Sequence, residues 1–155
     1  MKIAKIFGTS ITAVIVVLCF STFAAAGSCE DLKNLTLLEV TITSAVSLPA
    51  GANPAPGQTL PVPICQVVGK IDENINFEVW MPAKNQKFWN GKFNGVGNGG
   101  SAGFINYGAM SAALARGYAT ASTDTGHQAF LGDGSWALYR PENCAGFSRI
   151  PRQLA

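Results

Sequence analysis

Residues 93–127 read FNGVGNGGSAGFINYGAMSAALARGYATASTDTGH, and this stretch decides the fold. Its first four residues form a short segment suited to a strand. Five glycines then fall within nine residues, which disfavours a helix or strand there and predicts a loop. These are Gly95, Gly97, Gly99, Gly100 and Gly103.

A helix and a second strand are expected after this loop. Residues 107–116 have apolar side chains at helical spacing and are followed by Gly117, a residue type that commonly ends a helix. Residues 118–123 are rich in Ala and Thr, as expected of a buried strand beside a helix. The order strand, loop, helix, strand predicts a βαβ unit with two parallel strands and a right-handed crossover. The apolar residues at helical spacing are Met110, Ala113 and Leu114.

Three segments upstream have strand patterns, so the chain as a whole is expected to be an α/β protein. Residues 35–46 and 65–71 are rich in residues that favour strands, and residues 75–81 show a strong alternation. Residues 48–63 contain five prolines and two glycines, so neither a helix nor a central strand can persist there, and we expect a surface loop. The alternation places these side chains on one face of a strand: Ile75, Phe77, Val79 and Met81.

The first 26 residues have the three-part layout of a secretory signal. Two lysines make a basic start, residues 11–20 are almost wholly apolar, and three alanines before Gly27 offer a cleavage site. We therefore expect residues 1–26 to be removed and the protein to be secreted or periplasmic. A retained membrane anchor is an alternative, but the apolar run is shorter than the roughly 20 residues that cross a bilayer. Lipid attachment at Cys29 is a further alternative, although the residues before it lack the expected aliphatic side chain.

Cleavage would leave Cys29, Cys65 and Cys144, an odd number in a compartment that favours disulfides. Cys29 and Cys65 flank the Pro-rich segment. A bond between them would close a loop of about 35 residues and stabilise the fold by about 3–4 kcal/mol in the chain-entropy model. We favour this pair, which leaves Cys144 without a partner and suggests that its partner lies in sequence not present here.

Charge and composition argue against several classes of function. The 155 residues carry a formal net charge of +2 and only 13% charged side chains, without a basic stripe, so nucleic-acid binding has no electrostatic support. One histidine and no Cys-x-x-Cys spacing give no indication of a metal site. The length after signal removal suits one small domain, or part of one.

Four blocks of sequence together resemble the tannase and feruloyl esterase family of α/β-hydrolases. Each is a weak signal alone, but all four occur in the right order. They are FWNGKF at 88–93, GVGNGG at 95–100, NYGAM at 106–110 and RGYATASTDTGH at 116–127. We therefore assign residues 27–142 to the N-terminal portion of such a domain, with its early strands, one βαβ unit and an incomplete sheet. Residues 143–155 depart from the family's pattern and suggest a truncated or frameshifted tail.

The resemblance implies a secreted enzyme that hydrolyses phenolic-acid esters, such as those of gallate or ferulate, through a serine acyl-enzyme and without a cofactor. The family's nucleophile lies between a cysteine and two glycines, and its acid and its histidine follow later; none of these motifs occurs in this sequence. We therefore expect the chain to be inactive alone and marginally stable or prone to aggregate, because one sheet edge stays open. The expected partner is a small phenolic ester, with no nucleic acid and, after signal cleavage, no membrane; the oligomeric state stays open.

One catalytic element is represented in the sequence. Serine esterases need backbone N–H donors for the developing oxyanion, and in α/β-hydrolases one donor comes from a loop after an early strand. The resemblance makes Asn98, Gly99 and Gly100 the candidates for this oxyanion hole. The alternative is a glycine turn needed only for a tight passage from strand to helix.

A second reading of the same loop is a compact hydrolase. Residues 99–103 match G-x-S-x-G, and Ser101, Asp124 and His127 follow the hydrolase order. The match is weak in a glycine-rich segment, and Asp124 and His127 lie three residues apart on one loop, whereas the acid and base of this fold come from separate strands. We therefore interpret Ser101 as an incidental loop residue.

Asp124 and His127 follow the second strand of the βαβ unit, at the edge where open α/β sheets bind ligands. They are candidates for substrate contact, and the alternative is a structural role as hydrogen-bonded loop residues.

Aromatic side chains could hint at a phenolic substrate, but core packing is the default interpretation. These are Trp80, Trp89, Phe93, Phe104 and Tyr107. A secreted binding module without catalysis is the alternative to an esterase.

Overall fold

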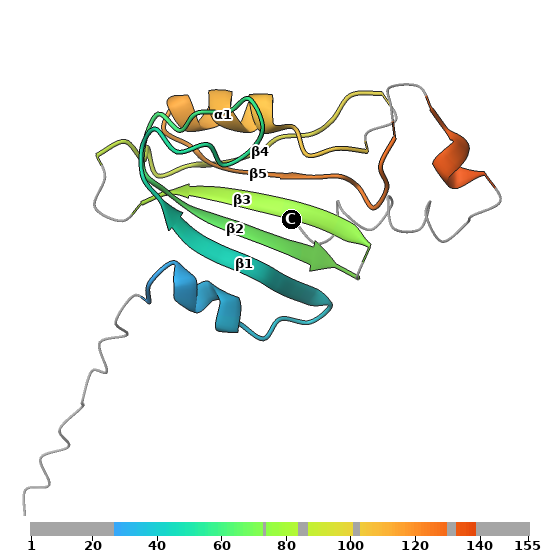
Figure 1. Ribbon diagram of the computed structural model, residues 1–155, viewed down its shortest axis with the longest axis horizontal. Helices are drawn as coiled ribbons and strands as arrows, with labels where there is room; N and C mark the ends of the chain where they lie inside the picture. Colours follow the sequence, from blue (N-terminus) through green and yellow to red (C-terminus); the bar gives the residue numbers. More distant parts are fainter. Residues whose placement is uncertain (1–26, 73, 84–86, 101–102, 130–132, 139–155) are drawn as a thin grey trace, which may run out of the picture.

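A mixed sheet with the strand order β1-β2-β3-β5-β4 forms the centre of the molecule (Figure 1). The computed structural model describes residues 27–72, 74–83, 87–100, 103–129 and 133–138. In this part of the chain the strands are β1 (Val40–Leu48), β2 (Ile64–Ile71), β3 (Ile75–Pro82), β4 (Phe93–Gly95) and β5 (Ala119–Thr123). The helices there are α1 (Tyr107–Ala115) and the 3-10 helices η1 (Glu30–Asn34) and η2 (Ser135–Ala137). The expected α/β fold is confirmed.

The sheet is antiparallel on one side and contains a parallel pair on the other. β1, β2 and β3 pair antiparallel in chain order, and β3 pairs antiparallel with β5. β4 pairs in parallel with β5, with Asn94 opposite Thr120, and α1 connects the two strands. The expected βαβ unit is therefore present. Among the described residues β4 pairs only with β5, so the sheet has an open edge there.

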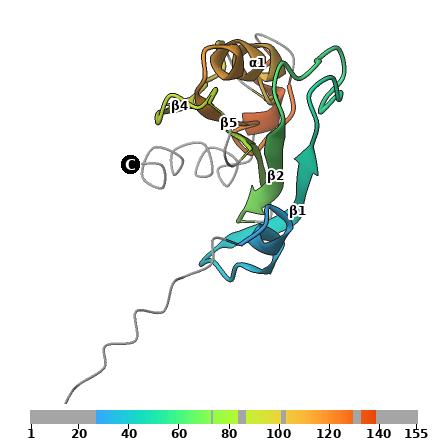
Figure 2. The ribbon, with the colours of Figure 1, turned by 90° about the vertical axis from the view of Figure 1, so that its left-hand side faces the viewer.

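Both ends of α1 have recognisable capping residues. The Asn106 side chain caps the helix by accepting a hydrogen bond from the Ala109 N–H at 3.1 Å. Gly117 ends it with a φ of +84°, and its N–H donates to the Leu114 carbonyl at 2.9 Å. In Figures 1 and 2, α1 lies over β4 and β5 at one end of the molecule and η1 lies beside β1 at the other. The buried side chains of α1 are Met110, Ala113 and Leu114, as the helical spacing indicated.

The first strand begins later than its sequence pattern indicated. We expected residues 35–46, but β1 covers Val40–Leu48. Glu39 has a φ of +58°, a left-handed conformation that interrupts an extended chain, and Leu35 ends η1. The apolar residues before Glu39 therefore lie outside the strand, and Leu38 is 89% exposed.

The Pro-rich segment is part of the core, so its assignment as a surface loop was wrong. It contains no helix or strand, as expected, but it folds back on itself: Leu60 donates its N–H to the Ala52 carbonyl and accepts from the Gly51 N–H, both at 2.9 Å. This pairing turns apolar side chains towards α1 and β3. The buried cluster consists of Ala55, Leu60, Val62, Ile64, Trp80, Met110 and Leu114. Prolines exclude regular structure without excluding burial.

The two faces of β3 differ from what a simple alternation suggests. Ile75, on the expected apolar face, is buried, but Phe77 and Val79 on the same face are only partly covered. The opposite face carries the buried side chains of Glu78 and Trp80 towards α1 and the Pro-rich segment. The principal core therefore lies on the side of the sheet where β3 also presents a carboxylate.

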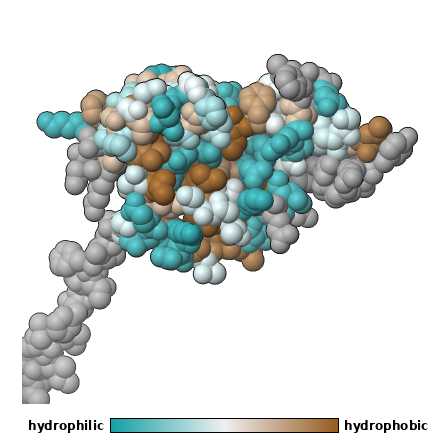
Figure 3. All heavy atoms as spheres, viewed as in Figure 1, coloured by the Kyte–Doolittle hydropathy of each residue, from teal (hydrophilic) through white to brown (hydrophobic). Residues whose placement is uncertain are grey.

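Core packing accounts for only some of the aromatic residues. Trp80 is fully buried and stacks on Tyr107, with ring centroids 6.0 Å apart. Trp89, Phe93 and Phe104 are 56%, 57% and 41% exposed, so core packing was wrong for these three. On the side of the molecule seen in Figure 3, hydrophobic spheres gather near the middle, with hydrophilic spheres to their lower left and to their right.

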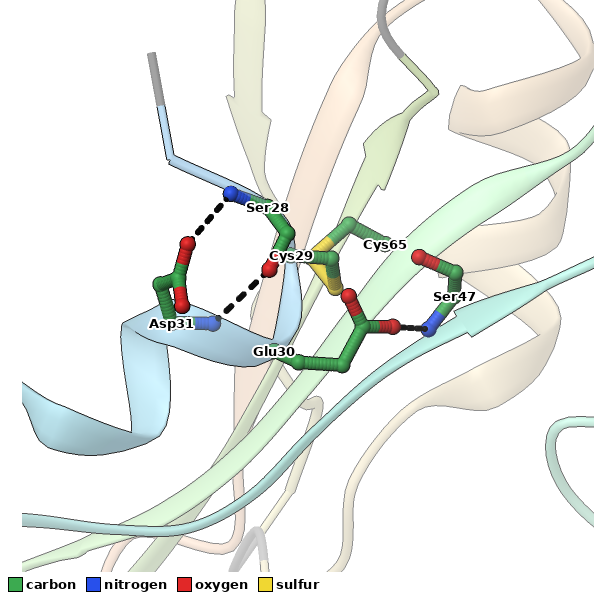
Figure 4. Close-up of a disulfide and its surroundings, with 6 residues drawn as sticks. All are labelled: Ser28, Cys29, Glu30, Asp31, Ser47 and Cys65. Atoms are coloured by element: carbon green, nitrogen blue, oxygen red, sulfur yellow. Dashed lines mark hydrogen bonds between the residues drawn. A yellow bond between two sulfur atoms is a disulfide. The ribbon is translucent and has the colours of Figure 1, made fainter. Parts of the chain in front are cut away.

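A disulfide joins Cys29 to Cys65, the pair favoured from the sequence (Figure 4). The bond links the start of η1 to β2, and the Glu30 carboxylate accepts a hydrogen bond from the Ser47 N–H of β1 at 2.9 Å. The N-terminal segment is thus fixed to the first two strands. Residues 1–26 and 143–155, with Cys144, lie outside the described residues. No helix in the described part is long and apolar enough to cross a membrane.

Candidate active site

The ends of the parallel strands β4 and β5 bring two loops together. The glycine loop, of which residues 96–100 and 103 are described, follows β4, and residues 124–127 follow β5. The Val96 N–H donates to the Ala121 carbonyl at 2.8 Å, so the two strands stay paired up to the point where the loops begin. Open α/β sheets bind ligands at this edge. Both groups of candidate residues therefore lie at the same edge of the sheet.

Within the glycine loop, the side chain of Asn98 points back into the protein. Its Nδ2 donates to the Thr123 carbonyl at 2.9 Å and to the Phe104 carbonyl. The side-chain amide is therefore not available as an oxyanion donor. The N–H groups of Asn98, Gly99 and Gly100 donate to no acceptor within the described residues, so the candidate donors of this loop are backbone groups.

The glycines of the loop fall into two kinds. Gly100 and Gly103 have φ values of +61° and +93°, which favour glycine, and a Cβ at Gly103 would lie 2.5 Å from the Ala129 nitrogen. Gly97 and Gly99 have no positive φ, and a Cβ at either position would meet no atom of the described chain within 4 Å. Neither the turn nor local packing explains glycine at these two positions.

The carboxylate of Asp124 is committed to the protein. It is 4% exposed, and its Oδ1 accepts from the N–H groups of Asn76 at 2.9 Å and Gly126 at 3.0 Å. Its Oδ2 accepts from the Asn76 side chain at 2.5 Å. These contacts join the loop after β5 to the start of β3, which is the structural alternative considered for this residue.

His127 lies near Asp124 but does not form a catalytic pair with it. The imidazole is 7% exposed and stacks on Trp136, with ring centroids 3.6 Å apart. Its Nδ1 lies 3.3 Å from Thr125 Oγ1, whereas the Asp124 carboxylate is bonded to residues 76 and 126. Ser101 lies outside the described residues. The geometry therefore does not assemble the Asp–His half of a self-contained triad.

A buried carboxylate behind the site was missed in the sequence. Glu78 is 6% exposed; its Oε2 accepts from Gln66 Nε2 at 2.9 Å and Trp80 Nε1 at 3.0 Å, and its Oε1 accepts from the Tyr107 hydroxyl at 2.8 Å. Burial, followed by the hydrogen bond to Glu78 and its charge, raises the pKa of Tyr107 well above its usual value. A glutamate between Phe77 and Val79 in an apolar strand was the available signal.

Two hollows flank these residues on opposite faces of the sheet. Glu78, Tyr107 and Asp124 border an open cleft of about 970 Å³. The other face carries an apolar groove of about 680 Å³, lined in part by Phe77 and Phe93. The described residues contain no group of three or more His, Cys, Asp or Glu side chains placed to hold a metal ion. The carboxylates that line the cleft, such as those of Glu78 and Asp124, already accept hydrogen bonds from the protein.

The family profile described as tannase and feruloyl esterase matches residues 59–150, which include both loops and the βαβ unit. The chain belongs to the tannase and feruloyl esterase family. An uncharacterized esterase of Xanthomonas campestris pv. campestris is 44% identical over 130 residues, covering 79% of this chain and 22% of that esterase. A probable feruloyl esterase B-2 of Aspergillus flavus is 32% identical over 76 residues, covering 46% of this chain and 14% of its relative.

Solved structures of the tannase and feruloyl esterase family have a similar fold. The crystal structure of feruloyl esterase B from Aspergillus oryzae matches with a TM-score of 0.64 and 26% identity. The match covers 77% of this chain and 25% of that enzyme. The chain thus spans about a quarter or less of the length of these family members.

Proposed function

We propose that this chain is the N-terminal portion of a secreted carboxylic ester hydrolase that cleaves phenolic-acid esters of the gallate or ferulate type through a serine acyl-enzyme. Residues 1–26 serve as its signal peptide, and residues 27–142 contribute the early strands and the βαβ unit of the hydrolase domain. Its role in catalysis is to supply part of the oxyanion hole. The names of its relatives, which include feruloyl esterases, support this substrate class.

The proposal rests on the backbone N–H groups of Gly99 and Gly100, which donate to no acceptor among the described residues. They lie at the edge where β4 and β5 end, and the absence of a side chain at Gly97 and Gly99 leaves room for a substrate carbonyl to approach the backbone. Donors placed for a developing oxyanion act more strongly than in water, because water is displaced from the site.

The chain alone is inactive in this proposal. The sequence lacks the family's nucleophile, acid and histidine motifs, and Asp124 and His127 do not replace them because Asp124 is bonded elsewhere. Purified chain should therefore release no product from methyl ferulate or methyl gallate above the rate of a blank. Ester turnover that disappears in Ser101→Ala would instead establish the compact hydrolase.

In the direct test, the coding DNA beyond the Ala155 codon is sequenced and translated in all three frames. The longest product that contains a downstream Cys-Ser-x-Gly-Gly motif is then expressed. This longer protein should hydrolyse methyl ferulate or methyl gallate. In it, Gly99→Pro removes one N–H donor and should lower kcat by about 10²- to 10³-fold, the usual loss for one oxyanion donor. Gly99→Ala retains the N–H but adds a Cβ, so it measures the steric part of the effect and should lower kcat less than Gly99→Pro does. Equal kcat values in the two variants would contradict a donor role for Gly99.

A further inference from the structure

We propose that Asn98 is a positioning residue that holds the glycine loop in the shape required for oxyanion binding. Its side chain acts from behind the loop, while the backbone N–H groups of Gly99 and Gly100 face the reaction. This inference rests on the proposed function, but its central claim, that one side chain fixes the loop, can be tested without catalysis.

The hydrogen bonds of Asn98 connect three parts of the chain. One Nδ2 hydrogen bond reaches the Thr123 carbonyl at the end of β5, 25 residues away in sequence, at 2.9 Å. The other reaches the Phe104 carbonyl, on the segment that enters α1. An amide nitrogen has two hydrogens to donate, and both are used. Asn98 therefore ties the loop to both neighbouring elements with one planar group.

The orientation of this amide is fixed by its partners. A rotation by 180° would place Oδ1 against two carbonyl oxygens, which are acceptors only. Oδ1 itself is buried and has no hydrogen-bond partner in the described part of the chain. All hydrogen bonds of the Asn98 side chain therefore pass through Nδ2, and a substitution that removes Nδ2 removes the whole connection.

The loop needs such a connection because its own composition favours disorder. Glycine loses more conformational freedom on folding than any other residue, and the space beside Gly97 and Gly99 is open, since a Cβ at either position would meet no atom of the described chain within 4 Å. Asn106 adds a weaker contact, from its Nδ2 to the Gly97 carbonyl at 3.4 Å, while its Oδ1 caps α1. Asn98 is the residue next to Gly99 and makes the shorter contacts, so we assign the positioning role to it.

The first test measures backbone order in the 155-residue chain by ¹⁵N relaxation. In the wild type, Gly99 and Gly100 should have order parameters near those of a rigid backbone, about 0.85, and in Asn98→Asp they should fall below about 0.6. Asn98→Ala removes the donor without adding a charge and should have the same effect. Asn34→Asp makes the same substitution at an exposed position whose side chain forms no hydrogen bond among the described residues, and it should leave the loop rigid. Dispersed signals from β2 and β3 show that each variant is folded.

The second test measures turnover in the longer protein described above. Asn98→Asp and Asn98→Ala should lower kcat on methyl ferulate by about 100-fold, the effect of a displacement of about 1 Å, and should change KM by less than threefold. Unchanged order parameters would overturn the proposal, and so would a flexible loop with unchanged kcat. Absence of turnover in the wild-type longer protein would contradict the proposed function instead, and the order parameters would still decide whether Asn98 fixes the loop.

Discussion

Replacing Tyr107 with phenylalanine removes one oxygen atom and tests whether the Glu78 network supports the site. The ring of Tyr107 stacks on Trp80 and should stay in place, because phenylalanine has the same ring. The hydroxyl donates to Glu78 Oε1 at 2.8 Å, and it is the only partner of that oxygen among the described residues. The substitution therefore isolates one hydrogen bond to a buried carboxylate.

The magnitude follows from the burial of Glu78, which is 6% exposed. Hydrogen bonds to charged groups contribute about 1.5–3 kcal/mol, and a buried acceptor left without a donor retains its full desolvation cost. We expect Tyr107→Phe to lower the free energy of unfolding by about 2 kcal/mol, measured by urea denaturation followed by circular dichroism. This corresponds to a fall in Tm of roughly 5–15 °C for a domain of this size.

The same variant should change how stability depends on alkaline pH. Folding raises the pKa of Tyr107 above its usual value of 10.0, through burial and then through Glu78. A raised pKa contributes stability that is complete below the unfolded pKa of about 10 and is lost as the pH rises above it. The wild type should therefore lose stability above pH 10 more steeply than Tyr107→Phe. The total loss should be modest, because Tyr107 is only partly buried and solvent screens part of the interaction that raises its pKa.

Tyr118→Phe is the matched control. The Tyr118 hydroxyl forms no hydrogen bond among the described residues, and its ring lies against Arg116, with the guanidinium carbon 5.1 Å from the ring centroid. Its removal should change stability by less than about 0.5 kcal/mol. If Tyr107→Phe and Tyr118→Phe unfold at the same urea concentration, the Glu78 hydrogen bond does not stabilise the fold and the reasoning fails.

Three further predictions concern other parts of the fold and use the same denaturation assay. Cys29→Ser combined with Cys65→Ser should cost about 3–4 kcal/mol by the chain-entropy relation, and reductant added to the wild type should reproduce the loss. Leu60→Ala should cost about 2–5 kcal/mol as a buried core substitution, whereas exposed Leu38→Ala should cost less than about 1 kcal/mol; similar losses would contradict a core role for the Pro-rich segment. Gly103→Ala should be destabilised by about 1–3 kcal/mol, because its Cβ meets a backbone nitrogen at 2.5 Å and its φ is +93°, and full stability would refute that contact.

The βαβ unit was predictable because each of its boundaries has a local cause. Each boundary is set by residues close to it in sequence: the glycines of the loop, the cap before the helix, and Gly117. The observed elements of this unit start and end within one residue of the expected positions. β1 was less predictable. The positive φ of Glu39 has no strong signal in a glutamate side chain, so the apolar run before it was assigned to the strand.

Burial was harder to predict than secondary structure. The Pro-rich segment reaches the core because distant parts of the chain, α1 and β3, offer an apolar surface, and no local pattern in residues 48–63 records that surface. The contacts within the candidate site were unpredictable for the same reason. The sequence located the glycine loop and residues 124–127, but the Asn98 bonds to Thr123 and Phe104 depend on the placement of three segments.

Buried polar side chains connect the core to the candidate active site, and this connection has an energetic consequence. Glu78 bonds to Tyr107 at the start of α1, and the neighbouring Asn106 donates its backbone N–H to Ser122 Oγ at 3.1 Å and its side chain to the Gly97 carbonyl. An apolar core would have avoided the desolvation of these groups, which is offset only when every partner is in place. The position of the glycine loop and the stability of the sheet are therefore coupled through the first turn of α1. A substitution at Glu78 should change the geometry of the loop although Glu78 makes no hydrogen bond to it.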